Sequence, residues 1–457
     1  MPRLPHFLTA SLIALSAAAS AEPGIDITIY ADNQALVQDV RTVTFNGGQQ
    51  RIEFKNVSAQ IRPETASLVA SDMSIVEQNF DYDLLSPVKI MENAVGQTIT
   101  LVRTNPATGA ETREQAVVLA ANGGVVLQIG NRIEVLRDDG LPVRVIFDHI
   151  PPNMRADPTL SVTVQGKAGT REASLRYLTP GLGWRADYVA LYDEGKGTID
   201  VQGWVTLTNN SGTTYNNART VLVAGSPRML NQGYQRGGYQ DQDDTMVEAG
   251  TESGTRARLG DYYLYPLAER TTIANMQTKQ VSFLDVHGAP AQHGYQLRLG
   301  WLQTSDIPIS AATMYSFSNS AQGGLGDQLP AGIVRFYLKD ARGQAQFIGE
   351  HAIGHTPMGS KLALSTGDAF DVKVKPVVEA RTKINDRRWK TQMSYTLTNA
   401  LPKPVTVQII QGGLWGDTKV AEESLKSERR DADSVAWNVT VPANGKTVVT
   451  ATFDSRY

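Results

Sequence analysis

The sequence predicts an all-β protein, mainly antiparallel, built from several β-sandwiches that are immunoglobulin-like or related, with few short helices. Three observations carry this prediction. Apolar and polar residues alternate in short runs along most of the chain, which is the pattern of strands with one buried face. Gly, Asn and Ser interrupt these runs where turns would join strands. At 457 residues and 41% hydrophobic, the chain is long enough for two or three domains of about 100–200 residues each.

Residues 1–21 are typical of a secretory signal peptide. Arg3 precedes a short apolar run, and Ala19-Ser20-Ala21 fits the small-residue pattern of a cleavage site. We therefore expect an exported protein. No later run approaches the length of about 18 apolar residues that a membrane helix needs, so no transmembrane span is expected after cleavage.

The composition excludes several classes of protein. The chain has no cysteine, which excludes disulfides, thiolate metal sites and a cysteine nucleophile. Its 43 basic residues are balanced by 46 acidic residues, and they form no basic stripe, so nucleic acid is not an expected partner.

The first predicted unit after the signal contains the best helix candidate, near residues 86–95. Ser86 is a good N-cap, Pro87 suits the first turn, and Gly96 follows the end. Further on, two apolar runs flank Gly130-Asn131, a two-residue turn typical of a β-hairpin.

Composition also predicts the domain boundaries. A Pro-rich stretch at 151–158 and a Gly/Ser-rich loop at 318–328 are the expected junctions. Residues 228–260 are rich in Gly, Gln, Asp, Glu and Ser and are predicted to be a mobile insert. The predicted units are an N-terminal β domain at 22–158, a β-sandwich at 159–317 that carries the insert, and a C-terminal β-sandwich at 318–457.

Two segments about 190 residues apart are similar to each other. Gly203–Asn210 and Met393–Ala400 both end a predicted strand on Leu-Thr-Asn and continue through a polar turn into a further strand. A duplicated sandwich would explain the similarity. Coincidence is the alternative, because Leu-Thr-Asn is a common way to end a strand.

Three phrases of the sequence resemble an exported bacterial family, domain of unknown function 4139, also called mucoidy-inhibitor-like proteins. The phrases are YLTPGLGWRADYVALY with GWVTLTNN inside 177–225, DYYLYPLAERTTIANMQTKQVSFLD at 261–285, and LPAGIVRFYLKD with FIGEHAIGHTPMG inside 329–359. The resemblance implies the periplasm or cell envelope of a Gram-negative bacterium. It brings no established activity and no catalytic or binding residues to carry over.

Tyr177, Tyr188 and Tyr215 are the candidate binding residues. Tyrosine is enriched in interface hot spots, so a cluster of aromatic residues can form a platform for a glycan or a peptide. The alternative is that these rings pack between the layers of a sandwich.

His351 and His355 are the candidate metal ligands, with the spacing that would place both on one face of a helix. Gly349, Gly354 and Pro357 favour an extended chain instead, in which the two rings would lie about 13 Å apart. We therefore expect no metal and no cofactor. The sequence also lacks a G-x-S-x-G nucleophile turn, and no catalytic residue is predicted.

These observations favour a non-catalytic recognition or scaffold module of the cell envelope, with an envelope protein or a glycan as its partner. The oligomeric state is left open. One alternative is an envelope hydrolase that acts on a glycan or a peptide in a cleft between domains. The other is an outer-membrane-associated β protein.

Overall fold

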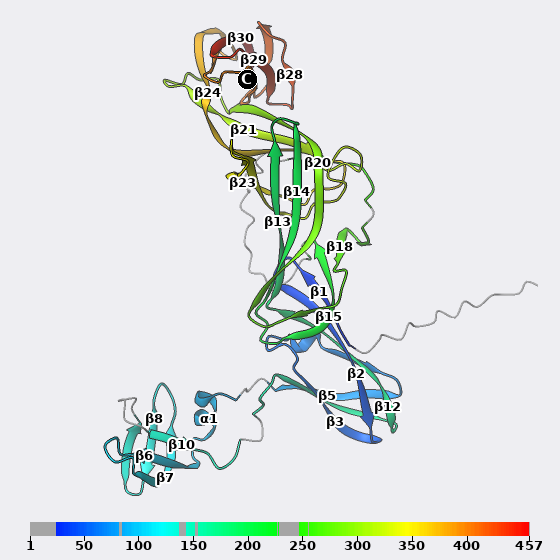
Figure 1. Cartoon of the computed structure of the whole chain (residues 1–457), viewed down its shortest axis with the longest axis vertical. Coiled ribbons are helices and arrows are strands. Elements are labelled where there is room, and N and C mark those ends of the chain that lie inside the picture. Colours follow the sequence, from blue (N-terminus) through cyan, green and yellow to red (C-terminus); the bar gives the residue numbers. More distant parts are fainter. Residues whose placement is uncertain are drawn as a thin grey trace, which may run out of the picture.

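The computed structural model describes residues 24–81, 85–136, 143–150, 154–225, 227, 246–254 and 256–456. The predicted signal peptide and residues 228–245 of the predicted insert lie outside this part. Within it, the all-β prediction is confirmed: the described residues form thirty strands, one α-helix and one short 3₁₀ helix, Pro63–Thr65. No described helix is long and apolar enough to cross a membrane. Figure 1 shows an elongated arrangement of sheets.

Two sheets at the N-terminal end enclose one core. The larger sheet has the order β17 (Arg258–Leu259), β18 (Tyr262–Pro266), β15 (Tyr215–Ala224), β1 (Gly24–Tyr30), β2 (Gln34–Phe45), β12 (Gly169–Pro180), β4 (Ser67–Ala70), with β19 (Thr271–Ile273) beside β15. The smaller sheet has the order β3 (Gly48–Lys55), β11 (Thr159–Gly166), β5 (Met73–Asp81). Alternate residues of these strands, such as Ile29, Val162 and Leu175, are fully buried in the shared core.

A small domain is inserted between β5 and β11. It consists of helix α1 (Pro87–Asn93) and a sheet with the order β10 (Val143–Ile146), β6 (Thr98–Thr104), β7 (Glu111–Ala120), β8 (Val125–Ile129), β9 (Arg132–Leu136). The Ser86 hydroxyl accepts a hydrogen bond from the Lys89 N–H at 3.1 Å, which confirms the predicted helix start. The predicted hairpin is also present, as β8 and β9. The domain has its own apolar core, which includes Leu101 and Leu127.

The first predicted domain boundary, at 158–159, does not separate two domains in the structure. β11 starts at Thr159 and pairs with β3 on one side and with β5 on the other. A cut at 158–159 would run through this sheet. The Pro-rich stretch precedes β11, where the chain returns from the inserted domain. The boundary was mispredicted because strand pairing across such a long separation leaves no signal in local composition.

The remaining strands form one branched sheet of fourteen strands. Its main path is β23 (Ala345–Ile353), β22 (Gly332–Lys339), β13 (Leu182–Asp193), β14 (Thr198–Asn209), β20 (Gln277–Leu299), β21 (Ile309–Ser318), β24 (Lys361–Asn385), β25 (Arg388–Asn399), β30 (Gly445–Arg456), β27 (Lys419–Glu423). The branches are β16 (Met246–Glu248), β26 (Val405–Gln411), β28 (Glu428–Arg429) and β29 (Val435–Val441).

Two long strands join the middle of the molecule to its C-terminal end. β20 has 23 residues and β24 has 25, and both run from the middle sheets into the C-terminal sandwich, as Figure 1 shows. The C-terminal sandwich has a separate core around Tyr395, Trp437 and Phe453. The predicted junction at 318–328 is hydrogen-bonded to the loop that precedes β24; the buried Asn319 side chain, for example, accepts from the Ser360 N–H at 2.6 Å.

Candidate functional site

The three tyrosines proposed as binding residues are buried. Tyr177, Tyr188 and Tyr215 are at most 2% exposed, and burial raises the pKa of each hydroxyl. The Tyr177 hydroxyl accepts from the Ser58 N–H at 3.2 Å, and the Tyr188 hydroxyl donates to the Pro330 carbonyl at 2.8 Å. These rings pack between layers of the protein and offer no surface to a ligand.

The two histidines lie in different surroundings. His351 is on β23, and its Nδ1 is 3.0 Å from the Ser365 carbonyl oxygen. His355 lies beyond the end of that strand, where its Nδ1 accepts from the Ala331 N–H at 3.2 Å. Among the residues that the structure describes, no three His, Asp or Glu side chains are grouped so that they could hold a metal ion.

A tyrosine-lined pocket is the strongest candidate for a binding site. Its volume is about 190 Å³, and its lining is predominantly apolar. Four segments meet there: the end of β15, the strand β18, and two loops that a β-bridge joins between Leu329 and Thr356. The lining residues are Ala224, Gly225, Asp261, Tyr262, Tyr263, Tyr265, Gln328, Leu329, Pro330, His355, Thr356 and Pro357.

Strand pairing and one glycine position the pocket tyrosines. β18 runs antiparallel to β15, with Ala224 opposite Tyr263 and Leu222 opposite Tyr265. Gly225, at the end of β15, has a φ of +127°, and a Cβ there would lie 2.1 Å from the Tyr262 ring. Only glycine therefore allows the ring to lie over the end of the strand. Tyr265 is 2% exposed and packs edge-on against Phe283, with ring centroids 5.9 Å apart, so the pocket rests on the core.

His355 supplies the pocket with a polar group of defined protonation. Burial lowers the pKa of His355, and the opposing attraction of Asp32 does not outweigh this effect. The ring is therefore neutral at pH 7. Because Nδ1 accepts from Ala331, the ring hydrogen is assigned to Nε2, which is a hydrogen-bond donor. This residue was singled out from the sequence, but as a metal ligand.

The second half of the predicted mobile insert packs against Gln328 and residues 358–362, beside this pocket, and we call the surface that it covers the groove. We call residues 246–256 the strap. Its first residues pair with the start of β24, and the Gly250 N–H then donates to the Ser360 hydroxyl at 2.9 Å. The Glu252 N–H donates to the Met358 carbonyl at 3.3 Å. The composition of the strap predicted a loop in solvent. The residues that hold it are about 70 to 110 residues further along the chain, so local composition could not reveal these contacts.

A second hollow of about 360 Å³ lies at the turn between β13 and β14 and is lined by charged residues, among them Asp193, Lys196 and Lys339. His287 lies there between two carboxylates, with Nε2 3.4 Å from Asp285 and Nδ1 3.7 Å from Asp200. Its side chain is 67% exposed. An imidazole between two acids is the arrangement that the hydrolase alternative would use.

No protein-family model matches the chain, and no curated protein matches it either. The tyrosine-lined pocket is nevertheless formed largely by residues of the three sequence segments that carry the family resemblance. Ala224 and Gly225 end the first, the three tyrosines of β18 begin the second, and residues 329–330 and 355–357 belong to the third. Sequence reasoning found the segments but not their convergence.

Proposed function

We propose that this protein is an exported, non-catalytic recognition protein of the bacterial cell envelope, which binds a segment of another envelope protein at the tyrosine-lined pocket. The observation that carries the proposal is the lining itself. Aromatic rings, two prolines and one neutral histidine surround a mainly apolar hollow, which is the composition of a binding pocket with few orienting polar groups.

The size of the pocket limits what it can hold. A volume of about 190 Å³ is smaller than the roughly 300–1,000 Å³ of pockets for drug-sized ligands, so the pocket fits one side chain or one ring. Tyr and Pro side chains are also what lines the grooves that hold proline-rich segments. We therefore expect one apolar or proline side chain of the partner to enter, while the rest of the partner lies on the neighbouring surface.

A site-specific crosslinking experiment tests this proposal in cells. A photo-crosslinking amino acid replaces Tyr262 in the pocket, or Phe370 as a control that is 87% exposed on β24. We expect one reproducible protein partner at position 262 only, and we expect Tyr263→Ala to reduce its capture at least tenfold. Equal capture at the two positions would contradict the proposal. A glycan captured in place of a protein would keep the site and change the ligand.

The hydrolase alternative rests on His287 and its two carboxylates. If this cluster is catalytic, the purified protein hydrolyses envelope glycans or peptides, and His287→Ala abolishes the reaction. The matched control is His351→Ala, which removes a histidine bonded to a backbone carbonyl. Turnover that His287→Ala leaves unchanged would exclude this cluster as the catalytic group.

A further inference from the structure

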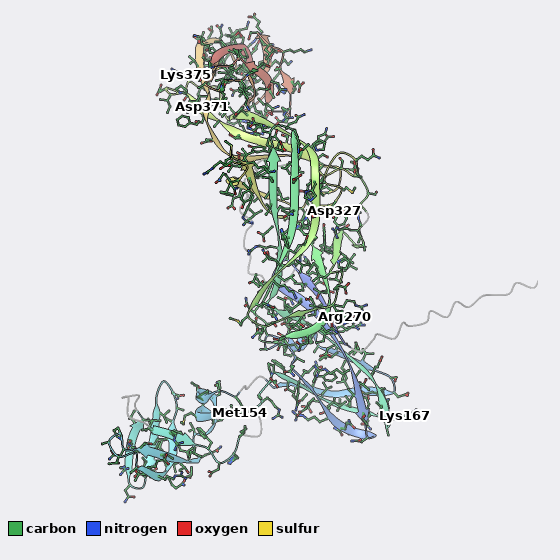
Figure 2. The ribbon with its side chains drawn as sticks, in the orientation of Figure 1. Met154, Lys167, Arg270, Asp327, Asp371 and Lys375 are labelled. Carbon is green, nitrogen blue, oxygen red and sulfur yellow. The ribbon has the colours of Figure 1, made fainter. Side chains whose placement is uncertain are left out.

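Arg256, in the strap, fills a socket made by three residues of the protein's middle part. Its guanidinium lies 4.2 Å from the centre of the Tyr265 ring, and its Nε is 2.8 and 3.0 Å from the two carboxylate oxygens of Asp327. Nη2 donates to the same carboxylate and, at 3.4 Å, to the Phe283 carbonyl. Figure 2 shows Asp327 in the middle of the molecule. A planar guanidinium that donates two N–H groups to one carboxylate and stacks on an aromatic ring is a geometry specific to arginine.

The socket is largely closed to solvent. The side chain of Arg256 is 20% exposed and that of Asp327 is 16% exposed. Burial disfavours the charge on Arg256, but the hydrogen bonds and the attraction to Asp327 outweigh this effect and raise its pKa. If the guanidinium left, Asp327 would remain as a poorly solvated carboxylate without its cation, which is strongly unfavourable. The socket therefore requires a guanidinium from some source.

The rest of the strap is held weakly. The side chains of residues 248, 249 and 251–253 are exposed, so they bury little apolar surface, which is the main source of stability in a folded chain. The Gly250 and Glu252 N–H groups are hydrogen-bonded, the exposed Glu252 carboxylate accepts from the Ala321 N–H at 2.8 Å, and the exposed Glu248 pairs with Lys361. Segments with such solvent-exposed contacts are the ones that open locally. The Arg256–Asp327 pair is largely closed to solvent and the Glu248–Lys361 pair is not, so Arg256 is the main anchor of the strap.

Two glycines define what the groove accepts. A Cβ at Gly250 would lie 2.0 Å from the Met358 carbonyl oxygen, which is backbone and cannot move aside easily. A Cβ at Gly254 would lie 1.1 Å from the amide of Gln328, a side chain that is 2% exposed and so has little room to move. The groove thus fits an extended segment of the form Gly-x-x-x-Gly-x-Arg.

We propose that this groove is a recognition site for a partner's extended peptide segment with the pattern Gly-x-x-x-Gly-x-Arg, and that the strap occupies the site in cis. A partner segment displaces the strap, adds to the edge of β24 where β16 now pairs, and places its arginine on Asp327 and Tyr265. The groove shares Tyr265 and Gln328 with the tyrosine-lined pocket, but the inference requires neither export nor a ligand in that pocket.

Calorimetry on the full chain tests the inference with a synthetic peptide of the strap sequence, residues 248–257. Arg256→Ala empties the socket, and we expect this variant to bind the peptide at least tenfold more tightly than the wild type does, because the wild type fills its own site. A peptide with Lys in place of Arg should bind at least tenfold more weakly. The control Arg256→Ala/Asp327→Asn should show the same loss.

A folded Arg256→Ala variant that does not bind the peptide, or that binds the Lys peptide equally well, overturns the inference. If Arg256→Ala does not fold, Gly250→Val replaces it, since this change loosens the strap against Met358 and keeps Arg256. If neither variant folds, the strap is a structural element and the inference fails. The crosslinking result at Tyr262 is independent of each of these outcomes.

Discussion

Two corners of the molecule, at Asn209 and at Asn399, have the same construction in different surroundings. Each asparagine ends a strand, β14 or β25, and is buried. Each side-chain N–H group donates to the carbonyl four residues on and to a carbonyl of a distant segment: Asn209 to Thr213 (2.9 Å) and Ile273 (3.0 Å), Asn399 to Lys403 (2.8 Å) and Pro442 (3.0 Å). Each side-chain oxygen accepts from the N–H two residues on, that of Ser211 (3.0 Å) or Leu401 (2.9 Å).

The strands that follow the two corners also behave alike. β15 pairs in parallel with β1, and β26 pairs in parallel with the second half of β20, although antiparallel pairing prevails in these sheets. The shared corner and the shared parallel strand favour duplication over coincidence as the origin of the repeated Leu-Thr-Asn. In both sandwiches the asparagine ties the end of its strand to the following turn and to a distant segment.

The two corners differ in the segments that pack against them and in their exposure to solvent. The first corner lies under the N-terminal sheets, where the Thr213 hydroxyl donates to the Val57 carbonyl at 2.7 Å and the Ala59 N–H donates to the Ser211 carbonyl at 3.0 Å. The turn of the second corner is exposed at residues 402–404, and Lys403 pairs with Glu194. One motif is thus sealed in an interface in the first copy and open to water in the second.

Asn209→Ala should have the largest effect on stability. It removes hydrogen bonds from the buried Ile273 carbonyl, from the Ser211 N–H and from the Thr213 carbonyl, which keeps the Ser211 hydroxyl at 3.4 Å, so we expect a loss of about 3 kcal/mol. Chemical denaturation, followed by the fluorescence of the tryptophans, measures it. A loss below about 1 kcal/mol would mean that the corner opens to water and that the two corners do not differ in access to solvent.

Asn399→Ala should cost less, about 1.5 kcal/mol, because water can replace the amide at the exposed Lys403 carbonyl. Asn438→Ala is the matched control, since Asn438 is an exposed asparagine on β29, the strand that pairs with β26. We expect the control to change stability by about 0.5 kcal/mol or less. Equal losses at Asn209 and Asn399 would show that burial of the turn is not what distinguishes the corners.

The local part of this structure was predictable from the sequence. Met393, Tyr395 and Leu397 alternate with polar neighbours and are fully buried, as their spacing predicts. The turn before β30 contains Asn444, with a φ of +47°, which is a conformation that asparagine tolerates well. Such features depend on neighbours in the sequence, so local reasoning finds them.

The long-range part was not predictable. The boundary at 158–159 fails because β11 finds its partners about a hundred residues back along the chain. The strap has the composition of a solvated loop, and its place depends on Asp327, 71 residues beyond Arg256. The tyrosine-lined pocket has no motif of its own, since its walls come from segments that only the sheet order brings together.

His293→Gln tests the junction beside the second corner. His293 is stacked on Tyr315 at 5.1 Å and contacts Tyr295. Burial lowers its pKa, the nearby Glu194 carboxylate raises it by less, and the positive charge of Lys403 lowers it slightly further. The folded protein therefore binds this proton less readily than the unfolded chain does. The contribution of neutral His293 is complete above about pH 6.5 and is lost as the pH falls below it. We expect the melting temperature of the wild type to fall more steeply than that of the variant between pH 7.5 and 5. Parallel curves would contradict this.

Lys403→Ala should have the smallest effect. Lys403 pairs with Glu194 across the junction, and this contact lowers the pKa of Glu194, but both side chains are more than half exposed. An ion pair of this kind contributes about 0–0.5 kcal/mol, because solvent screens it and the long side chains lose entropy. Melting curves of the wild type and the variant at low and high salt measure the contribution, which should vanish at high salt. A loss comparable to that of Asn399→Ala would mean that the ion pair stabilises the second corner as much as the asparagine does.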